Sequence, residues 1–470
     1  MTAASPPIAA IATPSGRGGI GIVRVSGHDL RALIAGIAGR ALPSRIATRV
    51  TFLDADGNVI DAGLALHFPA PHSYTGEDVV EWHGHGGPTV MRLLLARCLD
   101  FGARLAEPGE FTKRAFLNGK LDLAQAESVA DVIEASTATA VRAAARSLTG
   151  EFSREVHALR DALVDLRMYT EATLDFPDED IELLREGDVR ARLGAARERL
   201  ANVIARARSG AMLRQGLTVV LVGAPNVGKS SLLNRLVRDE AAIVTAIPGT
   251  TRDTVERQIE IAGIPLTIVD TAGLRETTDE VEMLGIARTR AAIARADVAL
   301  LLVDAREGSD PMMGVTPHDD RATRDARPSQ TARLLRELPP ALPRIVVHNK
   351  CDLARIAPHV ERTDASRVAV WLCALTGEGV ALLESEVQRT AGVGHSTEDA
   401  FFARARHLAA LNDASAHLAV AAAHVDVVPA PLELFAEELR LAQQAFSSIT
   451  GEFTADDLLG EIFSRFCIGK

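Results

Sequence analysis

The chain has 470 residues and a mass of 50.0 kDa, which corresponds to roughly two to four domains. Its net charge of −11 excludes a surface that is basic throughout, so a nucleic-acid partner would need a local basic patch. No uninterrupted apolar run reaches about 18 residues, and we expect no membrane span. Residues 1–12 lack the basic start and the long apolar stretch of a signal peptide. The four cysteines form no metal-ligand spacing, so we expect a reducing, cytoplasmic location.

The first part of the chain is punctuated by Gly and Pro. It contains short β-like runs at 21–26, 64–68 and 78–82, and one helical pattern from 89 to about 100. These elements predict a small α+β domain over residues 1–119.

The composition then becomes rich in Ala, Leu, Arg and Glu, with apolar residues three or four positions apart. This spacing predicts helices over 120–213, broken near 176–177 and at Gly187. Helical texture returns over 384–470, where a capping box at Thr454 and Asp457 predicts a last helix over about 455–466.

Strands and helices alternate between these helical parts, over residues 214–383, as is typical of a parallel sheet with helices on both faces. Within this region, residues 306–330 are polar and unpatterned, and we expect an exposed loop. The predicted fold is multidomain: an α+β N-terminal domain, a discontinuous helical domain and an inserted α/β domain.

A phosphate-binding loop is the most specific local motif. Residues 223–230, Gly-Ala-Pro-Asn-Val-Gly-Lys-Ser, follow an apolar run and precede a helical one, which is the context that a P-loop requires. The glycines let backbone N–H groups turn toward phosphate oxygens. Lys229 can reach the β- and γ-phosphates, and Ser230 can ligate Mg²⁺.

Three further motifs, each after an apolar strand, point together to a guanine nucleotide and to a P-loop GTPase domain. The carboxylate of Asp270 can hold the hydration shell of Mg²⁺, and the Gly273 amide can contact a γ-phosphate. Asp352 can accept two hydrogen bonds from guanine N1–H and its exocyclic amine, which adenine cannot offer. The backbone amides of 373–375 can meet the guanine oxygen. The predicted GTP-binding residues are Asn226, Val227, Gly228, Lys229, Ser230, Ser231, Thr245, Ala246, Ile247, Pro248, Gly249, Thr250, Thr251, Asp270, Thr271, Ala272, Gly273, Asn349, Lys350, Asp352, Cys373, Ala374 and Leu375.

GTP hydrolysis needs a group that positions the attacking water, and the residue that supplies it in many small GTPases is missing here. Leu274 stands where many small GTPases place a Gln that positions the attacking water. Another side chain, a cation or an arginine from a partner must therefore take part. The Asn226 side-chain carbonyl can ligate a monovalent cation beside the phosphates. Thr251 is the natural second Mg²⁺ ligand, although a surface loop with an N-cap threonine is the other interpretation of this segment.

Motifs along nearly the whole chain resemble those of the MnmE (TrmE) family of tRNA-modifying GTPases; they lie at 14–19, 74–78, 84–87, 108–112, 115–118, 120–127, 249–253 and 466–470. The resemblance implies that, with the flavoprotein MnmG, the protein adds an aminomethyl or carboxymethylaminomethyl group at C5 of the wobble uridine of certain tRNAs. It implies a homodimer that assembles with MnmG into a heterotetramer, with FAD entering only through that partner. The implied carbon source is a reduced folate, 5-formyl- or methylene-tetrahydrofolate.

The resemblance also assigns residues. It implies that K⁺ is held by Asn226, Thr245, Ile247 and Thr250, and that Mg²⁺ is held by Ser230 and Thr251. The catalytic residues that it implies are Glu282, which orients the attacking water, Lys229 and Thr251. Arg24, Glu81, Lys120 and Lys470 match the family's folate positions, and Cys467 is a candidate reactive thiol. Ala224, Cys351 and Cys373 depart from the usual family residues without removing a named ligand.

Other signals have less support. Residues 16–21 match the Gly-x-Gly-x-x-Gly pattern of dinucleotide-binding loops, but they are followed by a β-like run instead of the helix that such a loop requires. His83 and His85 alternate without a third metal ligand nearby, and residues 467–470 fit a prenylation box poorly. For the overall role, a GTPase switch in ribosome or RNA assembly is the alternative to tRNA modification. Such a switch needs neither a folate-like domain nor the Cys467 tail.

Overall fold

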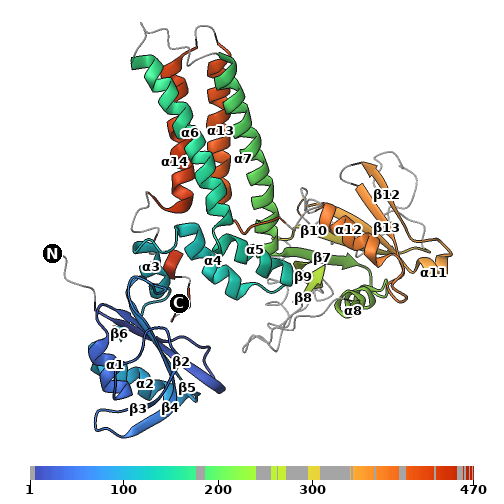
Figure 1. The fold of residues 1–470 in the computed structure, drawn as a ribbon. Helices are drawn as coiled ribbons and strands as arrows, with labels where there is room; N and C mark the ends of the chain where they lie inside the picture. Colours follow the sequence, from blue (N-terminus) through green and yellow to red (C-terminus); the bar gives the residue numbers. More distant parts are fainter. Residues whose placement is uncertain are drawn as a thin grey trace, which may run out of the picture. The chain divides into compact units, whose positions relative to one another are not determined.

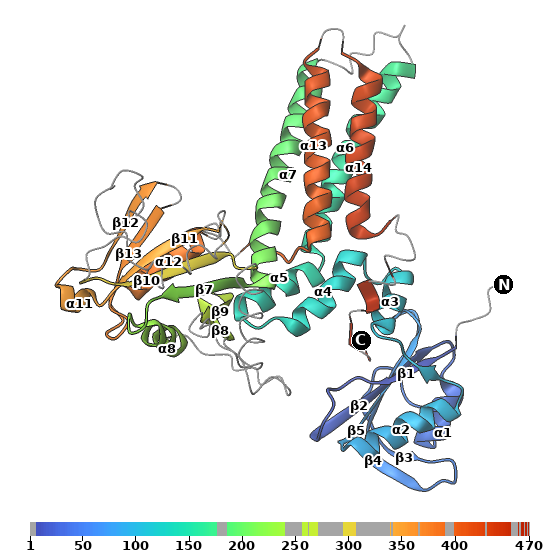
Figure 2. The same ribbon diagram turned by 180° about the vertical axis from the view of Figure 1, so that it is seen from behind.

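The computed structural model of the chain (Figures 1 and 2) describes the following residues: 6–175, 186–239, 256–261, 263–270, 295–306, 339, 342–364, 367–390, 399–427, 430–452, 459, 462–464, 466–467 and 469. Internal contacts divide the chain into two compact units. The first unit comprises Met1–Glu134, Ala145–Val203 and Arg406–Lys470, and the second comprises Ala135–Ala144 and Ile204–Ala405.

The first unit begins with a six-stranded sheet of order β3-β4-β5-β2-β1-β6. Its strands are β1 (Ile8–Ile11), β2 (Gly18–Gly27), β3 (Thr48–Leu53), β4 (Val59–Phe68), β5 (Asp78–Gly86) and β6 (Arg104–Leu105). All the pairs are antiparallel except β1 with β6. Arg24 on β2 lies opposite Glu81 on β5 in this register.

Two helices, α1 (Arg31–Ala38) and α2 (Pro88–Asp100), pack on the sheet. Alternate strand residues such as Val23 and Trp82 are fully buried against them, together with Leu94 from α2. The residues between these, including Arg24 and Glu81, therefore project from the other face of the sheet, because side chains alternate along a strand. The predicted α+β character of this part is confirmed.

Helices make up the rest of the first unit. They are α3 (Glu110–Leu117), α4 (Leu123–Glu134), part of α5 (Ala138–Leu148), α6 (Glu151–Asp175), part of α7 (Glu186–Gln215), α13 (Ala405–Val425) and α14 (Leu432–Thr450). Both views show α6, α7, α13 and α14 side by side (Figures 1 and 2). Helices on either side of the inserted segment thus form one bundle, as the sequence predicts.

The predicted last helix is described only in part. Residues 459 and 462–464 are helical, and Leu459 and Phe463 pack in one cluster with Leu123 of α4. The capping box at Thr454 and Asp457 lies outside the described residues, as does the predicted break at 176–177.

The second unit is built on a seven-stranded sheet of order β12-β13-β11-β10-β7-β9-β8. Its strands are β7 (Leu217–Gly223), β8 (Glu256–Ile261), β9 (Ile264–Asp270), β10 (Val298–Asp304), β11 (Arg344–Asn349), β12 (His359–Asp364) and β13 (Arg367–Trp371). Its further described helices are α8 (Lys229–Asp239), α11 (Cys351–Ala354) and α12 (Val380–Thr390). Strands β7, β9, β10, β11 and β13 run parallel, and the edge strands β8 and β12 are antiparallel.

The parallel strands explain where a site can form in the second unit. β7 and β10 are buried along nearly their whole length, as expected for strands covered on both faces. Ligands of such sheets bind outside the carboxyl ends of the strands. The segments that follow β7, β10, β11 and β13 meet at that edge. The predicted multidomain fold with an α/β P-loop domain is confirmed, whereas the three boundaries between the four segments drawn from the sequence stay predictions.

Among the described residues, none of the helices has the length and apolar character needed to cross a membrane.

Candidate functional site

The P-loop joins β7 to α8, as the sequence predicts. Gly223 ends the strand, and Lys229 begins the helix. Two loop residues have a positive φ, Asn226 at 64° and Gly228 at 99°. A side chain at Gly228 would collide with the Asn349 side-chain nitrogen, so only glycine fits there. The loop is therefore shaped by its glycine and by its contact with the strand β11.

The Lys229 ammonium lies within the loop. Its Nζ donates hydrogen bonds to the carbonyl oxygens of Gly223, at 2.8 Å, and Ala224, at 2.9 Å. Ser230 and Ser231 are exposed in the first turn of α8. The helix N-terminus carries positive partial charge. Together the loop, the lysine and the helix start are suited to an anionic phosphate chain, with the Ser230 hydroxyl available to a divalent cation that accompanies it.

Asn349, at the end of β11, connects two loops. Its Nδ2 donates to the Val227 carbonyl oxygen at 2.8 Å, and its Oδ1 accepts from the Ala374 N–H at 2.9 Å. Asn349 is only 2% exposed. One buried amide therefore fixes the P-loop and the segment 373–375 relative to each other.

Lys350 follows Asn349 with a φ of 66°. Its Nζ donates to the Asn226 carbonyl oxygen at 2.7 Å and to Asp304 Oδ2 at 2.9 Å. Asp304, the last residue of β10, also accepts hydrogen bonds from Arg306. Arg306 and Lys350 hold the pKa of Asp304 well below its ordinary range. Asp304 was not predicted from the sequence, although its place directly after the apolar strand residues 298–303 was an available signal.

The predicted base-binding residues lie in two neighbouring segments. Asp352 is exposed in the first turn of α11, and Leu375 is 77% exposed. The Cys351 N–H donates to the Leu372 carbonyl oxygen at 3.2 Å, which ties the two segments together. From α8, Arg235 donates to the Leu375 carbonyl oxygen at 2.6 Å. We call the segments 349–352 and 373–375 the base loops.

Several predicted residues lie outside the part of the chain that the structure describes. They are Thr245, Ala246, Ile247, Pro248, Gly249, Thr250, Thr251, Thr271, Ala272, Gly273, Glu282 and Lys470. Asp270 ends β9, whose register places it opposite Leu221 of the neighbouring β7.

A second group of predicted residues lies in the first unit, on the sheet face opposite α1 and α2. Arg24 forms an ion pair with Glu81, with Nη2 and Oε1 2.8 Å apart. His83 Nε2 lies 3.1 Å from the other Glu81 oxygen. The Arg24 guanidinium is also 5.7 Å from the centre of the Tyr74 ring and 5.8 Å from that of Phe111. A carboxylate and a guanidinium thus stand side by side beside aromatic rings.

The C-terminal segment reaches this group. Arg24 Nη1 donates to the Gly469 carbonyl oxygen at 3.4 Å, and the Gly109 N–H donates to the Cys467 carbonyl oxygen at 3.4 Å. Cys467 is exposed. Lys120 Nζ donates to the Pro71 carbonyl oxygen at 3.1 Å. Pro71 and Tyr74 belong to one loop, which therefore contacts both Lys120 and Arg24.

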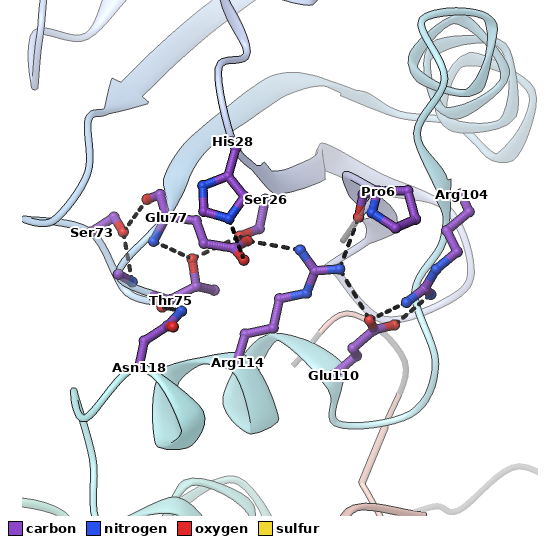
Figure 3. A network of polar contacts seen from close by, with 11 residues as sticks. Pro6, Ser26, His28, Ser73, Thr75, Glu77, Arg104, Glu110, Arg114 and Asn118 are labelled. Atoms are coloured by element: carbon purple, nitrogen blue, oxygen red, sulfur yellow. Dashed lines mark hydrogen bonds and ion pairs between the residues drawn. The ribbon is translucent and has the colours of Figure 1, made fainter. Parts of the chain in front are cut away.

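A buried polar network supports that loop (Figure 3). Arg114 donates to Glu77 Oε2 at 2.8 Å and to Glu110 Oε1 at 3.2 Å. Ser26 Oγ donates to the same oxygen of Glu77 at 2.9 Å, and Asn118 holds the Thr75 carbonyl oxygen at 2.7 Å. Buried charges paired in this way fix the loop against α3 and β2.

The parallel sheet, the P-loop after its first strand and the two base loops at the same edge define a P-loop GTPase domain. Two family models together match nearly the whole chain. Residues 7–120 match the family model "GTP-binding protein TrmE N-terminus", and residues 123–467 match "MnmE helical domain". The chain belongs to the MnmE (TrmE) family of tRNA modification GTPases.

Two relatives show the extent of the similarity. A Ralstonia nicotianae protein named tRNA modification GTPase MnmE is 59% identical over 468 residues, which cover 99% of this chain and 96% of that protein. A Nitrosomonas europaea protein of the same name is 57% identical over 465 residues, covering 98% of this chain and 99% of that protein. Among solved structures, the G domain of the T. maritima FeoB iron transporter matches 37% of this chain and 98% of that chain at 23% identity. Its TM-score is 0.25.

Proposed function

We propose that this protein is a K⁺-dependent GTPase that works with the flavoprotein MnmG to modify C5 of the wobble uridine in certain tRNAs. It would hydrolyse GTP to GDP and phosphate and would add an aminomethyl or carboxymethylaminomethyl group. The main support for the nucleotide part is Asn349, which joins the P-loop to the second base loop through two hydrogen bonds. The observation that carries the tRNA part is the family membership over nearly the whole chain.

In this proposal the P-loop binds the phosphates of GTP. Backbone N–H groups of 226–228 would face the phosphate oxygens, and the Lys229 ammonium would exchange its two carbonyl partners for the more strongly charged phosphates. Ser230 and Thr251 would hold Mg²⁺, which neutralises charge on the phosphate chain when bound.

Guanine would lie between the base loops. The exposed Asp352 carboxylate would accept hydrogen bonds from N1–H and the exocyclic amine, and the Lys350 stem would cover one face of the base. The N–H groups of Cys373, Ala374 and Leu375 would face the guanine oxygen. Adenine would leave Asp352 without a matching donor pair.

Hydrolysis would use a water that Glu282 orients toward the γ-phosphate, since Leu274 cannot take that role. K⁺ would be held by Asn226, Thr245, Ile247 and Thr250, and it supplies positive charge beside the phosphates when bound. Asn226 has a positive φ and is exposed in the P-loop. Two protomers would meet through their GTPase domains.

The folate would bind on the first unit. Glu81 suits the donor edge of a pterin, and Arg24, Lys120 and Lys470 suit the carboxylates of the glutamate tail. The Arg24 contact with the Gly469 carbonyl supports the proposal, because it brings the C-terminal segment to the same place. Cys467 would then be a reactive thiol beside the one-carbon unit. We further propose a homodimer, a heterotetramer with MnmG that contributes FAD, and a cytoplasmic location.

GTP hydrolysis in potassium and in sodium chloride tests the nucleotide part of the proposal. The parent protein should hydrolyse GTP faster in K⁺, and Asn226→Ala should remove the difference. Asn234→Ala, which changes an exposed asparagine on α8, is the matched control and should keep the preference for K⁺. Equal rates of the parent in both salts would contradict the cation assignment, and no hydrolysis in either would contradict the GTPase assignment.

A further inference from the structure

Asp304 is a buried carboxylate at the edge of the second sheet where the P-loop and the base loops meet. It is 5% exposed. Its Oδ2 accepts from Lys350 Nζ at 2.9 Å and from Arg306 Nη2 at 2.6 Å. Its Oδ1 accepts from Arg306 Nε at 2.9 Å and from the Arg306 N–H at 3.1 Å. A buried carboxylate must be paired, and this one is paired with two cations.

The strand register places Asp304 at this point. Asp304 on β10 lies opposite Asn349 on β11, and the Ala305 N–H donates to the Asn349 carbonyl oxygen at 2.8 Å. The residue after Asn349 is Lys350, whose ammonium turns back to the P-loop carbonyl of Asn226. The lysine is therefore held at its tip by two acceptors, one from the P-loop and one from the end of β10.

We propose that Asp304 is a positioning residue of the nucleotide site. By holding the Lys350 ammonium against the P-loop, it sets the lysine stem in place before a guanine base packs on that stem. A free lysine side chain would lose much of its rotamer freedom on binding the base, and an anchored one has already lost it. This inference rests on the proposed guanine-nucleotide site.

Arg306 shares the carboxylate of Asp304, whereas Lys350 joins that carboxylate to the P-loop carbonyl of Asn226. The Arg306 side chain is 53% exposed, whereas that of Lys350 is 26% exposed. Removing the arginine leaves the contact between Asp304 and Lys350 in place. The effect on nucleotide binding should therefore depend on which cation is removed: Lys350 is required, and Arg306 is dispensable.

If Asp304 only stabilised the fold, removing its charge would weaken nucleotide binding no more than removing the charge of another buried carboxylate. The chain offers such a carboxylate as a matched control. Glu386 on α12 is another carboxylate of the second unit, 2% exposed and shared by Arg362 and Arg389. It contacts neither the P-loop nor the base loops in the hydrogen bonds and ion pairs of the described residues. Glu386→Gln removes the same kind of charge from the same kind of environment.

The test measures the affinity of the full chain for a fluorescent GDP analogue in Asp304→Asn, Lys350→Met, the double variant, Arg306→Ala and Glu386→Gln. Asp304→Asn should weaken binding roughly tenfold, the usual effect of losing a charge-assisted hydrogen bond. It should raise the KM for GTP with little change in kcat. Competition by inorganic tripolyphosphate, which has no base, should be unchanged. The double variant should bind as weakly as Lys350→Met alone, because Asp304 acts through that lysine.

Arg306→Ala and Glu386→Gln should bind the analogue as the parent does. Parent-like affinity of Asp304→Asn, full additivity in the double variant, weakened tripolyphosphate binding, or an equal loss in Glu386→Gln would each overturn the positioning role. A parent chain that binds no guanine nucleotide would instead overturn the proposed function itself, so the two failures are distinguishable.

Discussion

Arg406 on α13 donates two hydrogen bonds to the carboxylate of Glu127 on α4, at 2.9 and 2.7 Å, although the two residues are 279 positions apart. Arg406 also donates to the Ser448 and Ile449 carbonyl oxygens at the end of α14. His407 Nε2 lies 2.8 Å from Glu127 Oε2 as a second ion-pair contact. Helices encoded before and after the inserted domain are therefore joined through one buried carboxylate.

This ion pair should contribute measurably to stability. Glu127 is 1% exposed, so Glu127→Gln would leave the charge of Arg406 poorly compensated. We expect a loss of about 3 kcal/mol in the free energy of unfolding. Denaturant unfolding of the full chain, followed by the circular dichroism signal of its helices, measures this loss of free energy. Glu437→Gln, which removes an exposed partner of Arg440, is the control and should leave unfolding unchanged.

The same carboxylate predicts a pH dependence of stability. Burial alone would raise the pKa of Glu127, but His407 and Arg406 hold the pKa below its ordinary range. The folded state therefore binds this proton less readily than the unfolded state, and the stabilisation is present above the ordinary glutamate pKa of 4.5. It should be lost progressively as the pH falls below that value. Melting temperatures between about pH 3 and pH 7 should fall less steeply with acid in Glu127→Gln than in the parent. Parallel curves for the two proteins would refute this assignment.

The Asp352 side chain should decide which base is bound. Asp352→Asn replaces a carboxylate that accepts two hydrogen bonds by an amide that can donate to the C2 carbonyl of xanthine. We expect kcat/KM for GTP to fall at least about 100-fold and XTP to become a substrate. Steady-state hydrolysis with both nucleotides measures the change. Asp352→Ala is the control: its kcat/KM for GTP should fall, but XTP should not become a substrate. An Asp352→Asn protein that still prefers GTP would show that the base lies elsewhere.

The sequence predicts the local parts of these sites better than the contacts between them. The strand, loop and helix around Lys229 follow from apolar runs and glycines, which are local signals. Asp304 was missed because its partner Lys350 is 46 positions away, and nothing in a strand-ending aspartate indicates that pairing. Arg24 and Glu81 were named only through the resemblance. Their ion pair depends on the register of β2 and β5, which tertiary packing sets.

Arg24 should be needed for folate binding. Arg24→Gln leaves Glu81 paired with His83 alone and removes the contact with Gly469. The affinity for 5-formyl-tetrahydrofolate should fall at least about tenfold, because a charge-assisted hydrogen bond to a carboxylate is lost. Isothermal titration calorimetry measures it. Arg31→Gln, which changes an exposed arginine paired with Asp29, is the matched control and should bind as the parent does. Equal affinities of Arg24→Gln and the parent would show that Arg24 does not belong to the folate site.

The role in tRNA modification is tested most directly by mass spectrometry of wobble nucleosides from cells that lack this protein. The aminomethyl-type modification at C5 of the wobble uridine should disappear in these cells. The parent chain should restore it, and Lys229→Ala, which lacks the P-loop ammonium, should not. An unchanged nucleoside profile in the deleted cells would contradict the proposed function and would favour a GTPase switch without a part in uridine chemistry.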